Sequence, residues 1–240
     1  MLYDKKYFQL SLVCKSKYKE VLNRFVNENQ IIINCDAVLC TNEPWGDNNK
    51  QIDLTFLDAY SKIKEGDPKV LKETVENIIV EQASTFENLF FVDGSVDNHG
   101  KVGAAIFAPS LNIKIKIKLP DHLSVYYAEG CAVLHALTLI SNLKMEKYCI
   151  ISDNAKVLQD LKFCALNDAP HPHLNELIAN HINDNNSASA SKIMWLPGHA
   201  EHPYLALIDS LAKSSSSSPL VPSQASFAYF SVECGPIIET

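Results

Sequence analysis

Four acidic residues stand at places in the chain where carboxylates could hold a metal ion. Asp93 ends the apolar run "NLFFVD", and Asp153 follows the apolar run "KYCIIS". Glu129 and Asp209 lie in two other segments, both with helical spacing. Carboxylates held close together repel and raise one another's pKa, and a divalent cation removes that penalty. Since hard cations prefer oxygen ligands, the set predicts a site for Mg²⁺ or Mn²⁺.

Each of these residues has a simpler explanation when it is taken alone. The triplet "DGS" that begins at Asp93 is a typical turn sequence. The stretch "SDN" around Asp153 is typical of residues that cap the start of a helix. Glu129 alone would be an ordinary helix charge, and Asp209 alone could be exposed. Only the joint arrangement of two strand-end aspartates and two helical carboxylates favours a single site.

Three strands joined by short turns are predicted first, and helices alternate with strands after them. The apolar runs on either side of Asn98-His99-Gly100 predict a β-hairpin. "LNIKIKIKLP" alternates between isoleucine and lysine, as expected of a half-buried strand. The full order is β-β-β-α-β-α-α-β-α. We therefore predict an α/β fold with a five-stranded mixed sheet, three antiparallel strands and then two parallel ones, with helices on both faces.

This topology predicts where the carboxylates lie. Ligands bind where the carboxyl ends of parallel strands meet, which places Asp93 and Asp153 at one edge of the sheet. In the helix predicted for 124–143, with Ser124 as N-cap, Glu129 shares a face with Ala132 and Ala136. Glu129 therefore faces the sheet, where a carboxylate is costly unless it is paired or binds a metal.

The flanking segments are less regular. "YKEVLNRFVNEN" has helical spacing, and 42–51 is a polar linker. A further helix is expected after Asp67 as N-cap and Pro68 at the first helical position. The run "SSSSSPLVPSQ" (214–224) is of low complexity, and "FAYFSVECG" after it is at most an isolated strand.

Composition restricts the class of protein. The net charge is −7, and Arg24 is the single arginine among 21 basic residues, which argues against indiscriminate nucleic-acid binding and predicts weak binding without metal. The seven cysteines are scattered, and Cys35 and Cys40 lack the partners that a zinc site needs. The sequence shows neither a signal peptide nor a long apolar span. We expect an intracellular protein, with nucleus or cytoplasm left open.

Four motifs of the chain resemble ribonuclease H of type 1. They are "FFVDGS", "AEGCAVLHAL", "IISDN" and "WLPGHAEHPYLALIDSLAK". More narrowly, they resemble the ribonuclease H domain at the end of non-LTR retrotransposon polyproteins, downstream of reverse transcriptase. The resemblance covers about 88–213, and "EPWGDNNKQIDLTFLD" resembles the linker before this domain in arthropod elements. No reverse-transcriptase motif is present, so we expect a detached tail of such an element.

The resemblance implies hydrolysis of the RNA strand in an RNA–DNA hybrid by a two-metal mechanism. Two Mg²⁺ or Mn²⁺ ions would be held by Asp93, Glu129, Asp153 and Asp209. His199 would assist proton transfer or product release from a mobile loop. The hybrid would be the partner, without a membrane or a small-molecule cofactor, and we expect a monomer.

Further residues are implied in substrate contact. They are Gly94, Ser95 and Asn154, with the backbone at Gly94 approaching the hybrid. Hybrid selectivity would come from 2′-hydroxyl and minor-groove contacts. Lys114, Lys116 and Lys118 could meet phosphates, or could simply form a solvated strand face.

The loop after His199 departs from the family. The family pattern has glycine, glycine, asparagine and glutamate where this chain has Glu201, Tyr204, Leu205 and Ala206. Loss of the glycines stiffens the loop, and loss of the polar pair removes contacts. Pro203 could start the helix instead.

We therefore predict three regions and keep three functional hypotheses. Residues 1–85 form a linker or remnant with weak helices, 86–214 a ribonuclease H-like domain, and 215–240 a Ser/Pro-rich tail. The leading hypothesis is a hybrid ribonuclease. The alternatives are a catalytically impaired nucleic-acid-binding remnant of the same fold, and a structural or protein-interaction remnant.

Overall fold

The structure is a computed structural model that describes residues 51–64, 67–163, 170–184, 190–216 and 229–234. The helix expected in "YKEVLNRFVNEN", most of the 42–51 linker, and Cys35 and Cys40 lie outside these residues. All of the described residues belong to one compact unit, 45–240.

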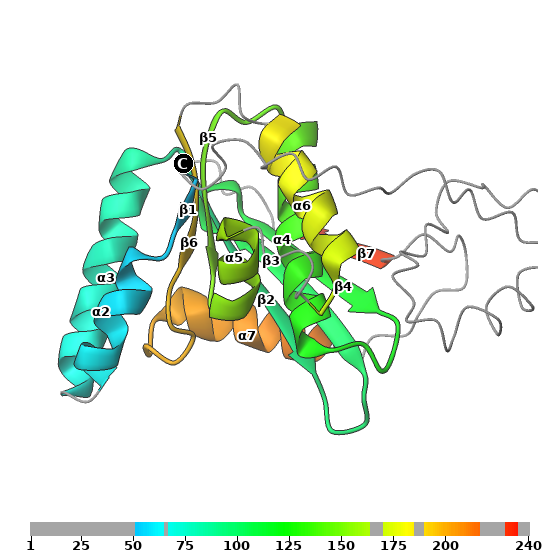
Figure 1. Ribbon diagram of the computed structural model, residues 1–240, viewed down its shortest axis with the longest axis horizontal. Coiled ribbons are helices and arrows are strands. Elements are labelled where there is room, and N and C mark those ends of the chain that lie inside the picture. Colours follow the sequence, from blue (N-terminus) through cyan, green and yellow to red (C-terminus); the bar gives the residue numbers. More distant parts are fainter. Residues whose placement is uncertain (1–50, 65–66, 164–169, 185–189, 217–228, 235–240) are drawn as a thin grey trace, which may run out of the picture. The chain divides into compact units, whose positions relative to one another are not determined.

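One mixed sheet organises the described part of the chain (Figure 1), with strands in the order β1-β6-β5-β2-β3-β4-β7. The neighbours β2, β3 and β4 are antiparallel, whereas β5 runs parallel to β2 and β6 parallel to β5. This confirms the α/β class and the predicted arrangement of the five central strands. The strands are β1 (Ile52–Asp53), β2 (Asn88–Val96), β3 (Val102–Ala108), β4 (Ile113–Leu119), β5 (Lys147–Ser152), β6 (Ala190–Trp195) and β7 (Tyr229–Cys234).

The predicted number of five strands is wrong, because a further strand is added at each edge. At one edge, β1 pairs in parallel with β6, and it is too short to show any periodicity. At the other edge, β7 pairs antiparallel with β4 from within the region that we predicted to be a tail. Edge strands are identified by what they pair with, which lies far away in the sequence.

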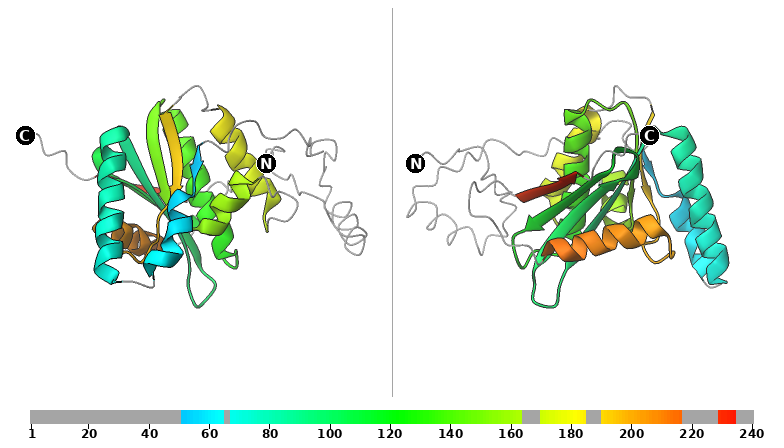
Figure 2. Two further views of the ribbon diagram at one scale, coloured as in Figure 1. Left: turned by 60° about the vertical axis from the view of Figure 1, so that its left-hand side comes forward. Right: turned by 180° about the vertical axis from the view of Figure 1, so that it is seen from behind.

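Helices cover both faces of the sheet, as the strand order predicts (Figure 2). Helices α2, α4, α5 and α6 contribute to or pack against one core, and α3 and α7 contribute to the other. The helices are α2 (Thr55–Lys64), α3 (Pro68–Thr85), the 3₁₀ turn η4 (Pro109–Leu111), α4 (Val125–Asn142), α5 (Ala155–Lys162), α6 (Pro172–Asp184) and α7 (Pro203–Ser216). None of the described helices is long and apolar enough to span a membrane.

The predicted helix starts are confirmed at three places. Asp67 caps α3 by accepting a hydrogen bond from the Lys69 amide, with Pro68 in the first turn. Ser124 caps α4 in the same way through the Tyr127 amide. Helix α7 begins at Pro203.

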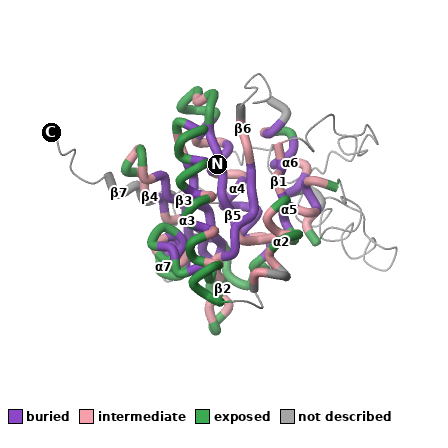
Figure 3. Tube along the Cα trace, turned by 90° about the vertical axis from the view of Figure 1, so that its left-hand side faces the viewer, coloured by how far each residue is buried: buried purple, intermediate pink, exposed green. Residues whose placement is uncertain are grey.

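Among the described residues, the central strands are the most buried (Figure 3). Successive residues of β2 alternate between the two cores, with Phe90 and Val92 in the first and Leu89 and Phe91 in the second. Asp93 continues the alternation on the side of α7, and Gly94 on the side of α4. This alternation decides which helix each residue of "FFVDGS" meets.

The lysines of β4 are less exposed than a solvated strand face would be. Lys118 is buried, and its Nζ donates to the carbonyl oxygen of Val102 and pairs with Asp121. Lys114 and Lys116 are half-buried on the same face, which α7 covers. A phosphate contact and a solvated strand face would both require exposed lysines. Lys118 is not exposed.

Candidate active site

Asp93 and Asp153 lie side by side because their strands are parallel neighbours. The register pairs Phe91 of β2 with Ile151 of β5, so each aspartate stands two residues beyond a paired position. The indole Nε1 of Trp195 donates to the carbonyl oxygen of Asp153 at 2.8 Å and holds the strand end in place. The prediction that the two strand ends meet is therefore confirmed.

Glu129 reaches the same place from α4 because Gly94 lets the helix lie against β2. A Cβ at Gly94 would lie 2.4 Å from the backbone nitrogen of Glu129 and 2.6 Å from the carbonyl carbon of Ala128. Any larger residue would push the helix away. The missing side chain of Gly94 thus serves helix packing, and Gly94 is buried under α4.

Ligand atoms of Asp93, Glu129 and Asp153 all lie within 4.8 Å of one another. Burial, followed by the charges of Asp153 and Asp209, raises the pKa of Asp93 to about 7. Burial and then the neighbouring Asp93 and Asp153 raise the pKa of Glu129 well above its ordinary value. Burial raises the pKa of Asp153 as well, although the charge of His199 opposes this. The described surroundings therefore favour the protonated form of all three carboxylates, despite the charge of His199 near Asp153.

A divalent cation fits this cluster. Glu129 is 4% exposed, and its Oε2 atom is buried without a hydrogen-bond partner among the described residues. Unpartnered buried oxygens are rare in folded proteins because each costs about 1–3 kcal/mol. Three oxygen donors with an unsatisfied atom among them match the preference of Mg²⁺ or Mn²⁺.

Asp209 lies near the cluster but is not part of it. Its charge contributes to the raised pKa values of Asp93 and Asp153. Its side chain is 50% exposed and forms an ion pair with Lys213, one helical turn later, at 2.8 Å. Asp209 is therefore placed at the rim of the cluster, with a competing lysine beside it.

The loop that ends β6 passes directly over Asp153. A Cβ at Gly198 would lie 2.1 Å from Asp153 Oδ2, so the loop can approach only because this residue is glycine. His199 is exposed, and its charge acts on Asp153. The sequence predicted a role for His199 but none for Gly198, although both stand in "WLPGH".

The remaining predicted contact residues have structural partners of their own. The side chain of Asn154 accepts a hydrogen bond from the Val157 amide at 3.0 Å and so caps α5. Ser95 is half-buried near the end of β2. The predicted contacts of Asn154 and Ser95 with the substrate stay predictions.

The loop after His199 lacks the glycines and the polar pair of the family pattern, and Glu201 and His202 order it instead. Glu201 adopts φ 51°, the left-handed conformation that glycine takes without strain. His202 is buried, and its Nδ1 accepts a hydrogen bond from the Tyr204 amide at 3.2 Å, which caps α7. The sequence reading missed His202, whose signal was its place directly before Pro203.

The fold and the carboxylate cluster define an α/β protein with a candidate divalent-cation site. A family model for RNase H matches residues 86–217, and the chain belongs to the RNase H family. No curated protein sequence matches the chain significantly. Among solved structures, the chain is similar to the crystal structure of RNase H1 from the halophilic archaeon Halobacterium salinarum NRC-1. The identity is 15% and the TM-score 0.43, over 53% of this chain and 96% of that chain.

Proposed function

We propose that this protein is an endonuclease that hydrolyses the RNA strand of RNA–DNA hybrids, of the type 1 class. The observation that carries the proposal is the triad of Asp93, Glu129 and Asp153, whose ligand atoms lie within 4.8 Å of one another. Asp93 and Glu129 are buried, and Asp153 is half-buried. Family membership supports ribonuclease chemistry, and the triad supplies the oxygen ligands for it.

Asp93, Glu129 and Asp153 would hold the cations, with Asp209 as a fourth ligand at the rim. Two divalent cations bound there supply a water activated for attack and a stabilised leaving 3′ oxygen. Glu129 is oriented by α4 and needs no movement to offer its free Oε2. Asp209 would have to exchange Lys213 for the cation. His199, exposed beside Asp153, would carry a proton to or from the reacting phosphate.

The test is incubation of the full chain with a labelled RNA–DNA hybrid and Mg²⁺, beside an Asp153→Asn variant. We expect cleavage of the RNA strand that stops on removal of Mg²⁺ and falls at least about 100-fold in the variant, because a ligand is lost. RNA duplex and DNA duplex of the same sequence serve as control substrates. Cleavage that is absent, or unchanged by the substitution, would refute the proposal.

A second candidate function is a module that binds the hybrid without cutting it. The left-handed Glu201 favours it, because it shows strain in the loop that carries His199. Leu205 is buried and Ala206 exposed where the family pattern has polar residues, so neither can contact a hybrid through a polar side chain. Hybrid binding with no Mg²⁺-dependent turnover would favour this function over the first.

We also propose that the chain derives from a non-LTR retrotransposon and acts as a monomer inside the cell. The four motifs and the upstream "EPWGDNNKQIDLTFLD" support the origin, and the scattered cysteines support the compartment. Size-exclusion chromatography with light scattering tests the monomer.

A further inference from the structure

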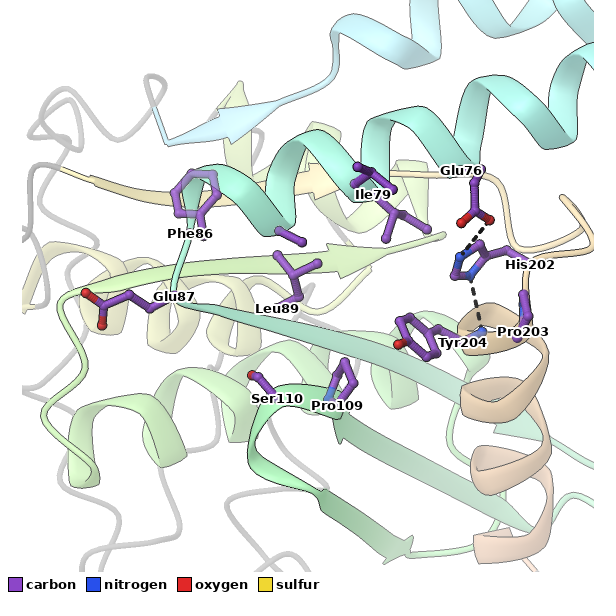
Figure 4. A pocket seen from close by; sticks show the side chains of 12 residues that line it. Glu76, Ile79, Phe86, Glu87, Leu89, Pro109, Ser110, His202, Pro203 and Tyr204 are labelled. Atoms are coloured by element: carbon purple, nitrogen blue, oxygen red, sulfur yellow. Dashed lines mark hydrogen bonds and ion pairs between the residues drawn. The ribbon is translucent and has the colours of Figure 1, made fainter. Parts of the chain in front are cut away.

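His202 connects the loop of the candidate site to a helix outside the family-matched region. Its side chain is 5% exposed, and Nδ1 accepts a hydrogen bond from the Tyr204 amide. The ring proton therefore lies on Nε2, which faces Glu76 Oε2 at 3.3 Å (Figure 4). A buried imidazole with both nitrogens engaged has a fixed orientation.

Glu76 belongs to α3, which precedes residue 86, the first residue of the family match. Val75 and Ile79 anchor α3 in the same core as Phe91 and Leu205. The helix is therefore held to the sheet independently of His202. Glu76 itself is 53% exposed, so its carboxylate can be changed without opening the core.

On its other side, His202 is connected to the candidate metal ligands through two contacts between rings. Its ring lies 5.1 Å from that of Tyr204, and the Tyr204 ring packs edge-on against Phe91 at 5.3 Å. Phe91 stands two residues before Asp93 on the same face of β2. We use "histidine loop" for residues 198–202, which run from the contact with Asp153 to the start of α7.

Beside the His202–Glu76 pair, the space between α3 and α7 is open. A groove of about 580 Å³ is lined by α3, by the start of β2, by η4 and by the first residues of α7. Figure 4 shows the imidazole at one end of this groove, where it bridges the two helices. The pair is thus a polar contact between α3 and the histidine loop at a place where apolar packing is interrupted.

We propose that Glu76 and His202 are positioning residues for the candidate site, and that α3 is a working part of the enzyme. Glu76 holds the imidazole through Nε2, the imidazole caps α7 through Nδ1, and the cap fixes both the histidine loop and the helix that carries Asp209. This inference rests on the proposed function for its effect on catalysis, but the loop order that it predicts can be measured without activity.

The experiment compares Glu76→Ala and Glu76→Gln with Glu73→Ala in the full chain. Glu73 is exposed on the same helix, so it controls for charge and helix propensity. Glutamine keeps an oxygen that can face Nε2, whereas alanine does not. The readouts are kcat and KM on the hybrid, and hydrogen exchange of the amides of 198–206.

We expect Glu76→Ala to lower kcat about 5-fold or more with KM within about twofold, because a positioning contact is lost. Its amides from 198 to 206 should exchange faster, while those of α4 are unchanged. Glu76→Gln should retain both the rate and the protection. Equal behaviour of Glu76→Ala and Glu73→Ala, or an equal loss in Glu76→Gln, would overturn the proposal. If the unaltered chain does not cleave the hybrid, the proposed function fails, and hydrogen exchange alone decides whether Glu76 orders the loop.

Discussion

Gly198 packs directly against the carboxylate of Asp153, and a Cβ at this position would lie 2.1 Å from Oδ2. That distance is far below van der Waals contact, so an added methyl group must displace either the histidine loop or the metal ligand. Gly198 does not have a positive φ, so an alanine here would meet the contact rather than backbone strain.

The Gly198→Ala substitution should therefore reduce hybrid cleavage about 10- to 100-fold, because small displacements at a reacting centre have effects of this size. Steady-state kinetics measures the loss, and circular dichroism checks that the fold is retained. Ser210→Ala, at an exposed position of α7, is the matched control. Full activity in the alanine variant would show that the loop does not determine the position of Asp153.

Glu129→Gln should abolish cation binding and yet stabilise the metal-free protein. The glutamine amide can keep the hydrogen bond that the Glu129 and Asp93 side chains already form. It also removes a buried acid whose pKa is raised well above its ordinary value, so folding no longer has to protonate or bury that charge. We expect a gain in the free energy of unfolding on the order of 1–2 kcal/mol at pH 7 in the presence of chelator. Urea denaturation measures it, with Glu73→Gln as control, and a loss of stability would contradict the explanation.

The stability of the metal-free protein should fall as the pH rises toward 8. The pKa of Asp93 is raised to about 7 in the folded protein, mainly by burial. It is about 3.9 in an unfolded chain. A raised acid pKa contributes stability at low pH that is lost as the pH passes from about 4 through about 7.

For Asp93 this loss is on the order of 2 kcal/mol between pH 5 and 8, and Asp93→Asn should remove most of it. Thermal unfolding in chelator at four pH values, with the two proteins compared at each, isolates this contribution. Mg²⁺ at pH 8 should restore stability only to the unaltered protein. Parallel pH curves for the two proteins would show that Asp93 is not buried among charges.

The residue Glu201 is in a left-handed conformation that glycine adopts without strain. Glu201→Gly should therefore raise the free energy of unfolding by about 0.5–1 kcal/mol, after allowance for the greater freedom of glycine in the unfolded chain. Glu201→Ala removes the same carboxylate but keeps the strained backbone, and it should show no such gain. If the two variants are equally stable, the charge and not the backbone is responsible.

Local patterns in the sequence were enough to predict the central fold. Alternation identified β4, capping residues identified the starts of α3 and α4, and chain order placed Asp93 next to Asp153. These features depend on neighbouring residues or on the topology of short connections. The edge strands β1 and β7 depend on partners more than 100 residues away, and no local pattern shows them.

Residue types were enough to predict the acidic residues of the candidate site. The residues whose role depends on close contact with a distant segment of the chain were not predicted. Gly94 was expected to admit the hybrid, yet the atoms next to it belong to α4. Gly198, Trp195 and His202 act by touching a backbone or a single carboxylate from another segment, which becomes visible only in three dimensions. Lys213 beside Asp209 is the exception, since a spacing of four residues on a helix could have indicated the pair.

The measurement that tests the central claim most directly is the rate of RNA-strand cleavage in a hybrid as a function of Mg²⁺ concentration. It is made on the unaltered chain and on Glu129→Gln. The account predicts a rate that is zero in chelator, rises to saturation with Mg²⁺, and is lost in the variant at every concentration. A rate that is absent at all Mg²⁺ concentrations, or that is the same in both proteins, would contradict it.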